Sequence, residues 1–203
     1  MQSTILSPAQ QKILPLLKSF KQDFFLAGGT AIALLLKHRK SIDFDLFTAE
    51  AIKPQALENA LLRAGYKPQT SVATVDEYTC VIAGVKLSFI SYPFPIVAEE
   101  DWEGVARIPS LLTLAAMKAY TLGRRAKWKD YVDIYFLLKN HFSVATISAE
   151  AARIFGGGFN TRAFREQLAY FKGIDYSEKV EFTSGNAVGD AEIQRFLTAA
   201  AVK

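Results

Sequence analysis

The sequence predicts an α+β protein in which a β-sheet with flanking helices is followed by an α-helical C-terminal region. Two observations support this fold class. Up to residue 105, short segments rich in β-branched and aromatic residues alternate with segments of helical character. From Pro109 onward the segments are of the helical type. We therefore expect two domains, an α/β domain at residues 1–105 and a helical domain at residues 106–203.

The first domain opens with an amphipathic helix at residues 8–20, within which Pro15 favours a kink or a break. Segments of strand and helix character then alternate along the chain. The predicted strands are residues 24–27 and 44–47, followed by a hairpin of residues 78–83 and 86–92 around Gly84. The predicted helices are residues 31–38 and 54–62, and Gly65 is expected to end the second of them.

The second domain is predicted to consist of helices. Their expected positions are residues 111–122, 131–139, 148–155, 161–171 and 190–201. The three glycines at residues 156–158 are interpreted as a turn between two helices, because no strand precedes them as it would in a phosphate-binding loop. Residues 179–182 are expected to be extended.

Composition excludes several classes of protein. With 203 residues, half of them hydrophobic, the chain can bury a sizeable core. Cys80 is the single cysteine, so the chain cannot form an intramolecular disulfide. No export signal or membrane-length apolar run is apparent, and we therefore expect a cytoplasmic protein. His38 and His141 lack a Ser or Cys partner in a recognisable motif, which argues against a hydrolytic triad.

A glycine pair follows the first predicted strand. Gly28, Gly29 and Thr30 stand between that strand and a helical segment. Glycines at a helix start let a phosphate approach the main chain, and the free N–H groups and helix dipole favour an anion. Alone this would be weak evidence, since tight turns between a strand and a helix are common.

A pair of carboxylates occupies the next predicted strand. Asp43 and Asp45 alternate with Ile42, Phe44 and Leu46. Side chains alternate between the faces of a strand, so the two carboxylates are expected to share one face. Neighbouring carboxylates repel each other unless a cation lies between them, and Mg²⁺ commonly bridges carboxylates to the phosphates of a nucleotide. The alternative interpretation is a pair of solvated residues on an edge strand.

The spacing of the two elements, Gly-Gly-Thr, twelve intervening residues and Asp-Phe-Asp, resembles the signature of the DNA polymerase β-like nucleotidyltransferase superfamily. Within it, the chain resembles the nucleotidyl transferase AbiEii/AbiGii toxin family. The segments that carry this closer resemblance are residues 26–34, 38–47 and 116–138, and the last contains Ala116-Met117-Lys118, Gly123-Arg124-Arg125 and Lys129-Asp130-Tyr131-Val132-Asp133. The resemblance therefore extends over much of residues 24–138.

The resemblance implies a nucleotidyltransferase fold with a small mixed sheet and a set of site residues. The expected catalytic residues are Asp43, Asp45, Lys118 and Asp130, with Asp43 and Asp45 as the ligands of Mg²⁺. The expected nucleotide-binding residues are Gly28, Gly29, Thr30, Arg39, Ser41 and Lys129. Asp133 lies one helical turn after Asp130 and is placed to join the same network.

A run of basic residues lies within residues 116–138. Between Lys118 and Lys129 there are five basic residues and no acidic residue, the others being Arg124, Arg125 and Lys127. Such a run is usually a solvated face or loop, but near a triphosphate it could also neutralise phosphate charge and steer a nucleic acid. We assign Lys118 and Lys129 to the site and leave both interpretations open for the other three residues. The formal net charge of +4 permits a polyanionic partner without requiring one.

One position departs from the superfamily pattern. Ser88 stands where a third catalytic carboxylate would be expected on a later strand, and serine carries no charge. Asp76 and Glu77 on the neighbouring segment are the candidates to replace it. This departure keeps open a protein that binds a nucleotide without transferring it.

The sequence thus predicts a magnesium-dependent nucleotidyltransferase that modifies RNA such as tRNA, like the toxins of bacterial toxin–antitoxin or abortive-infection systems. The partners that the resemblance implies are a nucleoside triphosphate, the RNA acceptor and a cognate antitoxin protein, with no membrane. Two alternatives remain: a catalytically weakened protein that binds nucleotide or nucleic acid, and an enzyme that attaches a nucleotide to a protein hydroxyl.

Overall fold

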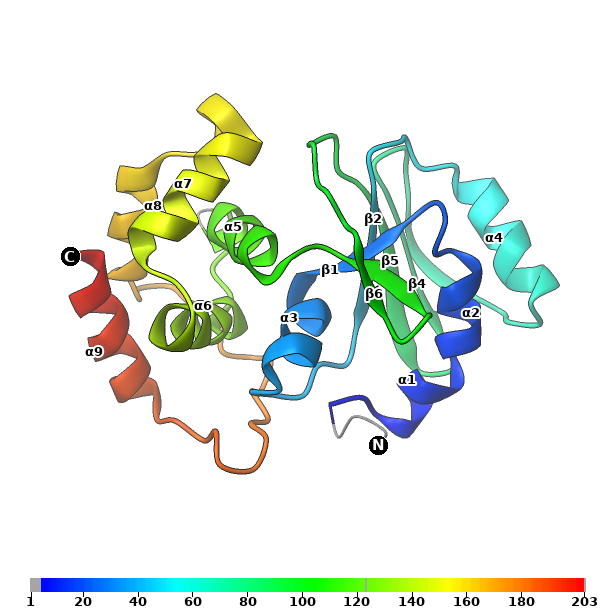
Figure 1. Ribbon diagram of the computed structural model, residues 1–203. Coiled ribbons are helices and arrows are strands. Elements are labelled where there is room, and N and C mark those ends of the chain that lie inside the picture. The colour runs from blue at the N-terminus through cyan, green and yellow to red at the C-terminus, as the bar shows by residue number, and fades with distance from the viewer. Residues whose placement is uncertain (1–4, 123, 203) are drawn as a thin grey trace. The chain divides into compact units, whose positions relative to one another are not determined.

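The computed structural model describes residues 5–122 and 124–202 (Figure 1). The chain divides into two compact units: unit 1 contains residues 1–34 and 41–110, and unit 2 contains residues 35–40 and 111–203. The predicted division lies between residues 105 and 106. Residues 106–110 instead belong to the first unit, because a strand at Ala106–Ile108 (β7) pairs with the sheet of that unit.

Unit 1 is built on a mixed sheet, as the fold class predicts. Within the described residues it has seven strands in the order β3-β4-β5-β2-β1-β7-β6. Besides β7, these are β1 (Phe25–Ala27), β2 (Phe44–Thr48), β3 (Gln69–Ala73), β4 (Glu77–Ile82), β5 (Val85–Ser91) and β6 (Glu100–Trp102). The central strand β2 runs antiparallel to β1 and parallel to β5. This register places Asp45 between Ala27 on one side and Ser88 on the other.

The helices of unit 1 cover the sheet. They are α1 (Pro8–Lys12), α2 (Leu14–Ser19), α3 (Gly28–Leu36, of which residues 28–34 belong to unit 1) and α4 (Pro54–Arg63). Figure 1 shows α1, α2 and α4 on one face of the sheet. On that face, the ring centroid of Phe89 lies 4.9 Å from that of Phe20 and 5.1 Å from that of Phe24. Burial of these aromatic rings stabilises the packing of α2 on the sheet.

Local signals explain where several elements begin and end. The predicted helix at residues 8–20 is interrupted at Ile13, which ends α1 and precedes α2, with Pro15 in the first turn of α2. The break predicted from Pro15 is therefore confirmed. The main chain turns away after α4 at Gly65, whose φ of +85° is a conformation that favours glycine.

Three strands of the sheet lack a strand signal in the sequence. Of these, β3 is mostly exposed and polar, and it is held by antiparallel pairing with β4. The short strands β6 and β7 pair with each other, and β7 also pairs with β1. These strands form because a neighbouring strand supplies their hydrogen bonds. The pattern of apolar residues within one segment does not reveal such a partner.

Unit 2 is helical. Its helices are α5 (Leu111–Leu122), α6 (Trp128–Asn140), α7 (Val144–Phe155), α8 (Thr161–Leu168) and α9 (Asp190–Ala201), with a 3₁₀ turn at Gly156–Gly158. The helix α6 supplies fully buried side chains, among them Tyr131, Ile134 and Tyr135. The helix α7 begins earlier than predicted because the Ser143 side chain accepts a hydrogen bond from the N–H of Thr146 and caps the helix there.

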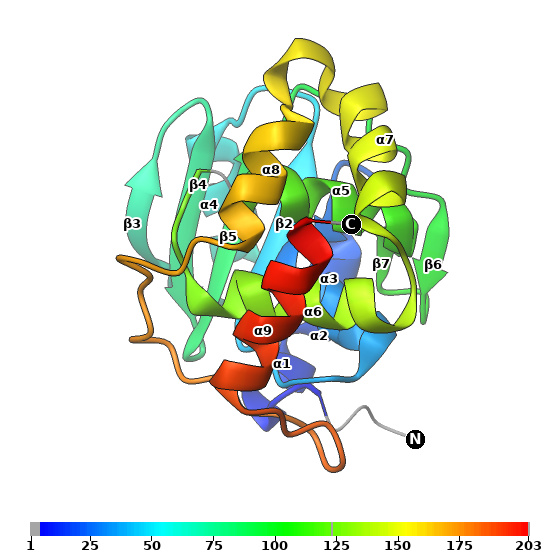
Figure 2. The same cartoon turned by 90° about the vertical axis from the view of Figure 1, so that its left-hand side faces the viewer.

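Irregular backbone connects α8 to α9. We call residues 169–189 the strap; Figure 2 shows this segment in orange between the two helices. Two isolated bridges hold it, Lys127 with Asp175 and Arg39 with Phe182. The second bridge agrees with the extended conformation predicted for residues 179–182. The backbone of the strap is therefore paired with the rest of unit 2 at two separate points.

Among the described helices, none combines the length and the apolar character that crossing a membrane requires.

Candidate functional site

The glycine turn of unit 1 lies directly against the carboxylate strand. Gly28 has a φ of +70°, in the left-handed region that favours glycine. A Cβ atom placed on Gly28 would lie 2.6 Å from Oδ2 of Asp45, closer than real contacts allow. Position 28 therefore requires glycine for two independent reasons, its backbone conformation and the approach of the Asp45 carboxylate. The predicted phosphate-binding turn and the predicted metal ligand are neighbours.

Thr30 fastens the first turn of α3 to the segment that carries the other carboxylate. Its side chain is buried, and its hydroxyl donates a hydrogen bond to the main-chain carbonyl of Asp43. The same hydroxyl lies 2.7 Å from the hydroxyl of Ser41. Thr30 and Ser41, both expected to bind nucleotide, thus also position the chain that leads into β2. Unit 1 brings together Gly28, Gly29, Thr30, Ser41, Asp43 and Asp45.

The alternation expected around the two aspartates is present within β2. Asp45 is half-buried, and its neighbours Phe44 and Leu46 are buried on the other face of the strand. Asp43 precedes the strand and is also half-buried. Ile42, expected on the apolar face, is instead 68% exposed, because β2 begins only at Phe44 and no strand pairs with residue 42.

The position of the missing third carboxylate is defined by the sheet register. Ser88 on β5 is the register partner of Asp45, and Thr79 on β4 is the partner of Ser88. Register partners share a face of the sheet, so this row presents one carboxylate and two hydroxyls. Glu77 lies two residues from Thr79 on the same face, where it accepts a 2.6 Å hydrogen bond from the Thr79 hydroxyl. With β5 between β4 and β2, Glu77 is two strands across the sheet and two residues along it from the row of Asp45, about 12 Å at the backbone.

The donor set fits a divalent cation that also takes ligands from a substrate. In the part of the chain that the structure describes, no group of three or more His, Cys, Asp or Glu residues could hold a metal ion by itself. Mg²⁺ is often bound through one or two carboxylates together with substrate phosphates and water. Asp43 and Asp45 beside the N–H groups of the glycine turn are compatible with that mode of binding.

The remaining predicted site residues belong to unit 2, where Lys118 and Asp130 form a buried ion pair. The ammonium of Lys118 lies 2.7 Å from Oδ1 of Asp130 and 3.0 Å from Oδ2 of Asp133. Lys118 is 4% exposed and both carboxylates are fully buried. Burial alone would lower the pKa of Lys118, but Asp130 and Asp133 raise that pKa above its ordinary value. The predicted pair of catalytic residues is therefore in direct contact.

Arg39 enters the same network through Asp133. Its Nε lies 2.7 Å from Oδ1 and its Nη2 lies 2.9 Å from Oδ2 of that carboxylate, a bidentate arrangement. Nε2 of His38 also contacts Oδ1, at 2.9 Å. Burial would raise the pKa of Asp133, and Arg39 and Lys118 instead hold that pKa well below its usual range. Arg39, expected to bind nucleotide, is committed to a buried carboxylate.

The His38 side chain is buried beside Phe136. In a neutral ring whose Nε2 donates to Asp133, the other ring nitrogen carries only a lone pair. That atom, Nδ1, has no hydrogen-bond partner. An unpaired acceptor of this kind is less costly than an unpaired buried N–H group.

The basic run between Lys118 and Lys129 divides into separate contacts. Arg125 donates from Nε to Oδ2 of Asp130 at 2.7 Å, which closes the outer end of the buried network. Burial would raise the pKa of Asp130, and Lys118 and Arg125 lower it. Arg124 stacks on the ring of Tyr120 at 3.5 Å. Gly123, part of the same sequence motif, lies outside the described residues.

Lys129, expected to bind nucleotide, does not join this network. Its ammonium pairs with one carboxylate oxygen of Glu178 in the strap, and the ammonium of Lys127 pairs with the other. Burial would raise the pKa of Glu178, but the hydrogen bonds and charges of the two lysines lower it to about 2. The contribution of Glu178 was not apparent from the sequence, because the strap lies 49 residues from Lys129.

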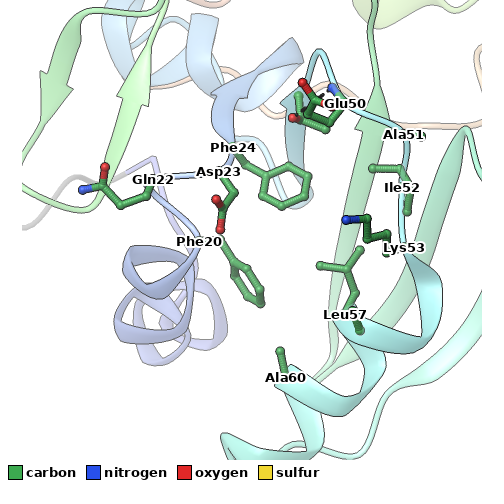
Figure 3. A pocket seen from close by; sticks show the side chains of 12 residues that line it. Phe20, Gln22, Asp23, Phe24, Glu50, Ala51, Ile52, Lys53, Leu57 and Ala60 are labelled. Carbon is green, nitrogen blue, oxygen red and sulfur yellow. Dashed lines mark hydrogen bonds between the residues drawn. The ribbon is translucent and has the colours of Figure 1, made fainter.

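A separate pocket lies at the opposite end of β1 and β2 from the glycine turn. Its volume is about 570 Å³, and Figure 3 shows Phe20 and Phe24 on one side with Lys53 and Leu57 on the other. Its remaining lining residues are Gln22, Asp23, Thr48, Glu50, Ala51, Ile52, Ala56 and Ala60. None of the predicted site residues is among them, so this cavity is distinct from the glycine turn and the aspartates.

The mixed sheet, the glycine turn and the adjacent carboxylates are the arrangement expected of a nucleotidyltransferase fold. Residues 16–67 match the family described as "Nucleotidyl transferase AbiEii toxin, Type IV TA system". This segment contains the glycine turn and both aspartates. The predicted resemblance to that family is confirmed over this segment.

The chain is also similar to a curated protein of Aquifex aeolicus (strain VF5), described as uncharacterized protein aq_aa25. The two are 31% identical over 128 residues, which cover 59% of this chain and 59% of that protein. The chain thus spans less than two thirds of the length of this relative.

Two solved structures show the same fold. JHP933 from Helicobacter pylori has a TM-score of 0.63 at 18% identity, covering 97% of this chain and 92% of that one. MenT4, the nucleotidyltransferase toxin Rv2826c from Mycobacterium tuberculosis H37Rv, has a TM-score of 0.61 at 12% identity, covering 95% and 81%. The predicted α+β nucleotidyltransferase fold is confirmed.

Proposed function

We propose that this protein is a metal-dependent nucleotidyltransferase that transfers a nucleoside monophosphate from a nucleoside triphosphate to a hydroxyl of RNA, such as tRNA. The observation that carries the proposal is the contact between Gly28 and the Asp45 carboxylate. It brings a helix start that favours phosphate and a carboxylate that favours a cation within one contact distance. A magnesium triphosphate presents both groups.

The reaction requires little covalent chemistry from the protein. The acceptor hydroxyl loses its proton to water, its oxygen forms a bond to the α-phosphorus, the bond from that phosphorus to the bridging oxygen breaks, and pyrophosphate leaves. Mg²⁺ held by Asp43 and Asp45 would supply charge neutralisation when bound. The N–H groups of the turn would hold the β- and γ-phosphates, and Thr30 would keep Asp43 in position through the Asp43 carbonyl.

Lys118 and Asp130 are assigned catalytic roles in this proposal. Both groups are buried: the ammonium of Lys118 donates a hydrogen bond to Asp130 and lies 3.0 Å from Asp133. Arg39 and Lys129 are assigned to nucleotide binding, although each pairs with a carboxylate here. A cognate antitoxin in the cytoplasm is the protein partner that the toxin family implies.

The proposal is tested by transfer of label. The purified protein is incubated with Mg²⁺, total RNA and each α-labelled nucleoside triphosphate in turn. The test variant is Asp43→Ala/Asp45→Ala. The matched control is Glu99→Ala/Glu100→Ala, which removes two exposed carboxylates from the same unit. Label on RNA with the native protein and the control, but not with the test variant, is the expected result.

Ser88 favours one alternative, a protein that binds a nucleotide without transferring it. Serine replaces a charged ligand beside Asp45, which would weaken catalysis more than binding. Binding of a triphosphate that depends on the aspartates, without label on RNA or protein, would favour this alternative. Label on the protein instead of RNA would identify a protein hydroxyl as the acceptor.

A further inference from the structure

Two lysines at the start of α6 converge on a single carboxylate. Lys127 pairs with Oε1 of Glu178 and Lys129 pairs with Oε2. The three side chains are partly exposed, at 36%, 21% and 40%. Each oxygen of the carboxylate therefore pairs with a different ammonium group, in a place that solvent and solutes can reach.

This pair of lysines needs an anion. Lys127 is the residue that precedes α6, and Lys129 lies in its first turn. The positive end of the helix dipole disfavours cations there, and the two ammonium groups also repel each other. Glu178 relieves both effects, and its pKa of about 2 agrees with strong stabilisation of its charged form. A phosphate group, with its negative charge shared between oxygens, would relieve them in the same way.

The strap pairs a further carboxylate with a third lysine. Glu181 pairs with Lys40 of unit 2 through its side chain, and the N–H of Lys40 donates to the Glu181 carbonyl at 2.8 Å. Beside the first pair, the N–H of Trp128 donates to the Asp175 carbonyl at 3.0 Å. The strap thus carries carboxylates onto Lys40, Lys127 and Lys129. It has no helix or strand of its own beyond isolated bridges, so it can move without breaking a regular element.

We propose that Lys127 and Lys129 form a phosphate-binding site and that Glu178 occupies it as an internal competitor. A phosphate of the substrate binds by displacing Glu178 from the two lysines. The inference rests on the proposed function for its two sources of phosphate, the backbone of an RNA acceptor and the triphosphate of a nucleotide. Removing the charge of Glu178 is then expected to strengthen binding of one of them.

The test compares two substitutions, each of which removes one negative charge. Glu178→Gln is the test variant, and Glu166→Gln is the matched control, because Glu166 also pairs with a basic residue, Arg162, in unit 2. Binding of fluorescein-labelled tRNA is measured by anisotropy over a series of salt concentrations. Glu178→Gln is expected to tighten binding about two- to fivefold relative to the control, the range of a partly exposed ion pair.

A second background shows whether the lysines carry the effect. Lys127→Gln/Lys129→Gln should weaken tRNA binding and lower the slope of log Kd against log salt by about 1.4 to 1.8, for two phosphate contacts. In that background, Glu178→Gln should have no further effect. The same set is titrated with a nucleoside triphosphate and Mg²⁺. An effect on tRNA alone identifies the RNA backbone, and an effect on the triphosphate identifies the nucleotide.

The proposal is overturned if Glu178→Gln binds both probes as Glu166→Gln does, or if its gain persists without the two lysines. Circular dichroism and thermal unfolding of each variant verify the fold. If Glu178→Gln is unstable, the loss of tRNA binding in Lys127→Gln/Lys129→Gln still tests whether the two lysines bind phosphate. Binding requires no transfer, so the comparison is repeated in Asp43→Ala/Asp45→Ala protein. A gain there, together with no labelling of RNA by the native protein, would leave this site standing while the proposed function failed.

Discussion

At the scale of single residues, Gly28 shows most directly why the site has its sequence. Positive φ is shared by Gly28 and Gly84, but their surroundings differ. A Cβ on Gly28 would meet the Asp45 carboxylate, whereas nothing lies within 4 Å of a Cβ on Gly84. Comparing the two positions separates the backbone requirement from the requirement imposed by the neighbouring carboxylate.

We predict that Gly28→Ala lowers the free energy of unfolding by about 1–3 kcal/mol more than Gly84→Ala does, because both variants carry backbone strain but only the first overlaps a neighbouring carboxylate. Urea unfolding measures both values. In the Asp45→Ala background the excess for Gly28→Ala should shrink, since the overlapping atoms are gone. Equal losses of stability at the two glycines would show that the overlap with Asp45 does not affect the free energy of unfolding.

Asp133 is the central residue of the buried network, because both Arg39 and Lys118 depend on it. We predict that Asp133→Asn lowers the free energy of unfolding by about 3–5 kcal/mol, since it leaves two buried cations with one carboxylate fewer. Glu166→Gln breaks an exposed pair with Arg162 and should cost less than about 1 kcal/mol. Chemical denaturation of the two variants compares them, and similar small losses would contradict a central role for Asp133.

At the scale of elements, the pairing of β2 with β5 decides what stands beside Asp45. Ser88 is buried and is the register partner of Asp45. A carboxylate placed there would repel Asp45 unless a cation lay between the two. Substitutions at Ser88 can therefore test whether this face of the sheet binds a metal.

We predict that Ser88→Asp is less stable than the neutral, similarly sized Ser88→Asn when EDTA is present, because of repulsion from Asp45. Mg²⁺ should recover most of that difference while changing Ser88→Asn little more than the native protein. Thermal unfolding with and without Mg²⁺ gives both comparisons. If Mg²⁺ leaves the gap unchanged, the face does not bind the cation as proposed.

Elements with a strong local signal were predictable, and elements that depend on a partner were not. Residues 111–122 and 190–201 were predicted as helices and coincide with α5 and α9, because their apolar periodicity is local. By contrast, β3 consists of exposed polar residues, and β7 is a short strand paired with β1 from a distant part of the chain. Pairing between distant segments produces such strands, and no single segment records it.

The same distinction holds for the site at the scale of the whole molecule. The glycine turn and the aspartates were predictable because twelve residues separate them and the turn and strand are local elements. The contact of Arg39 with Asp133 joins residues 94 apart, and that of Lys129 with Glu178 joins residues 49 apart. The sequence suggested that these basic residues meet anions, which they do. It could not indicate that those anions are carboxylates of the same chain.

Charge pairs within unit 2 also determine how stability depends on pH. The pKa of Glu178 falls from its ordinary value of 4.5 to about 2 in the folded protein, and the pKa values of Asp130 and Asp133 fall below 3.8. A carboxyl group with a lowered pKa in the folded state contributes stability that is fully present above its unfolded pKa. That contribution is lost as the pH falls through the folded pKa, because protonation favours the unfolded chain.

We therefore predict that Glu178→Gln is less stable than the native protein above pH 4.5, and that the gap closes as the pH falls from 4.5 to about 2, where native Glu178 becomes protonated and neutral like glutamine. Urea unfolding over this range measures the gap. Leu168→Ala removes buried apolar surface from the same unit, so the difference in stability between this variant and the native protein should not change with pH. A gap for Glu178→Gln that stayed constant down to pH 2 would mean that the two lysines do not hold this carboxylate in its charged form.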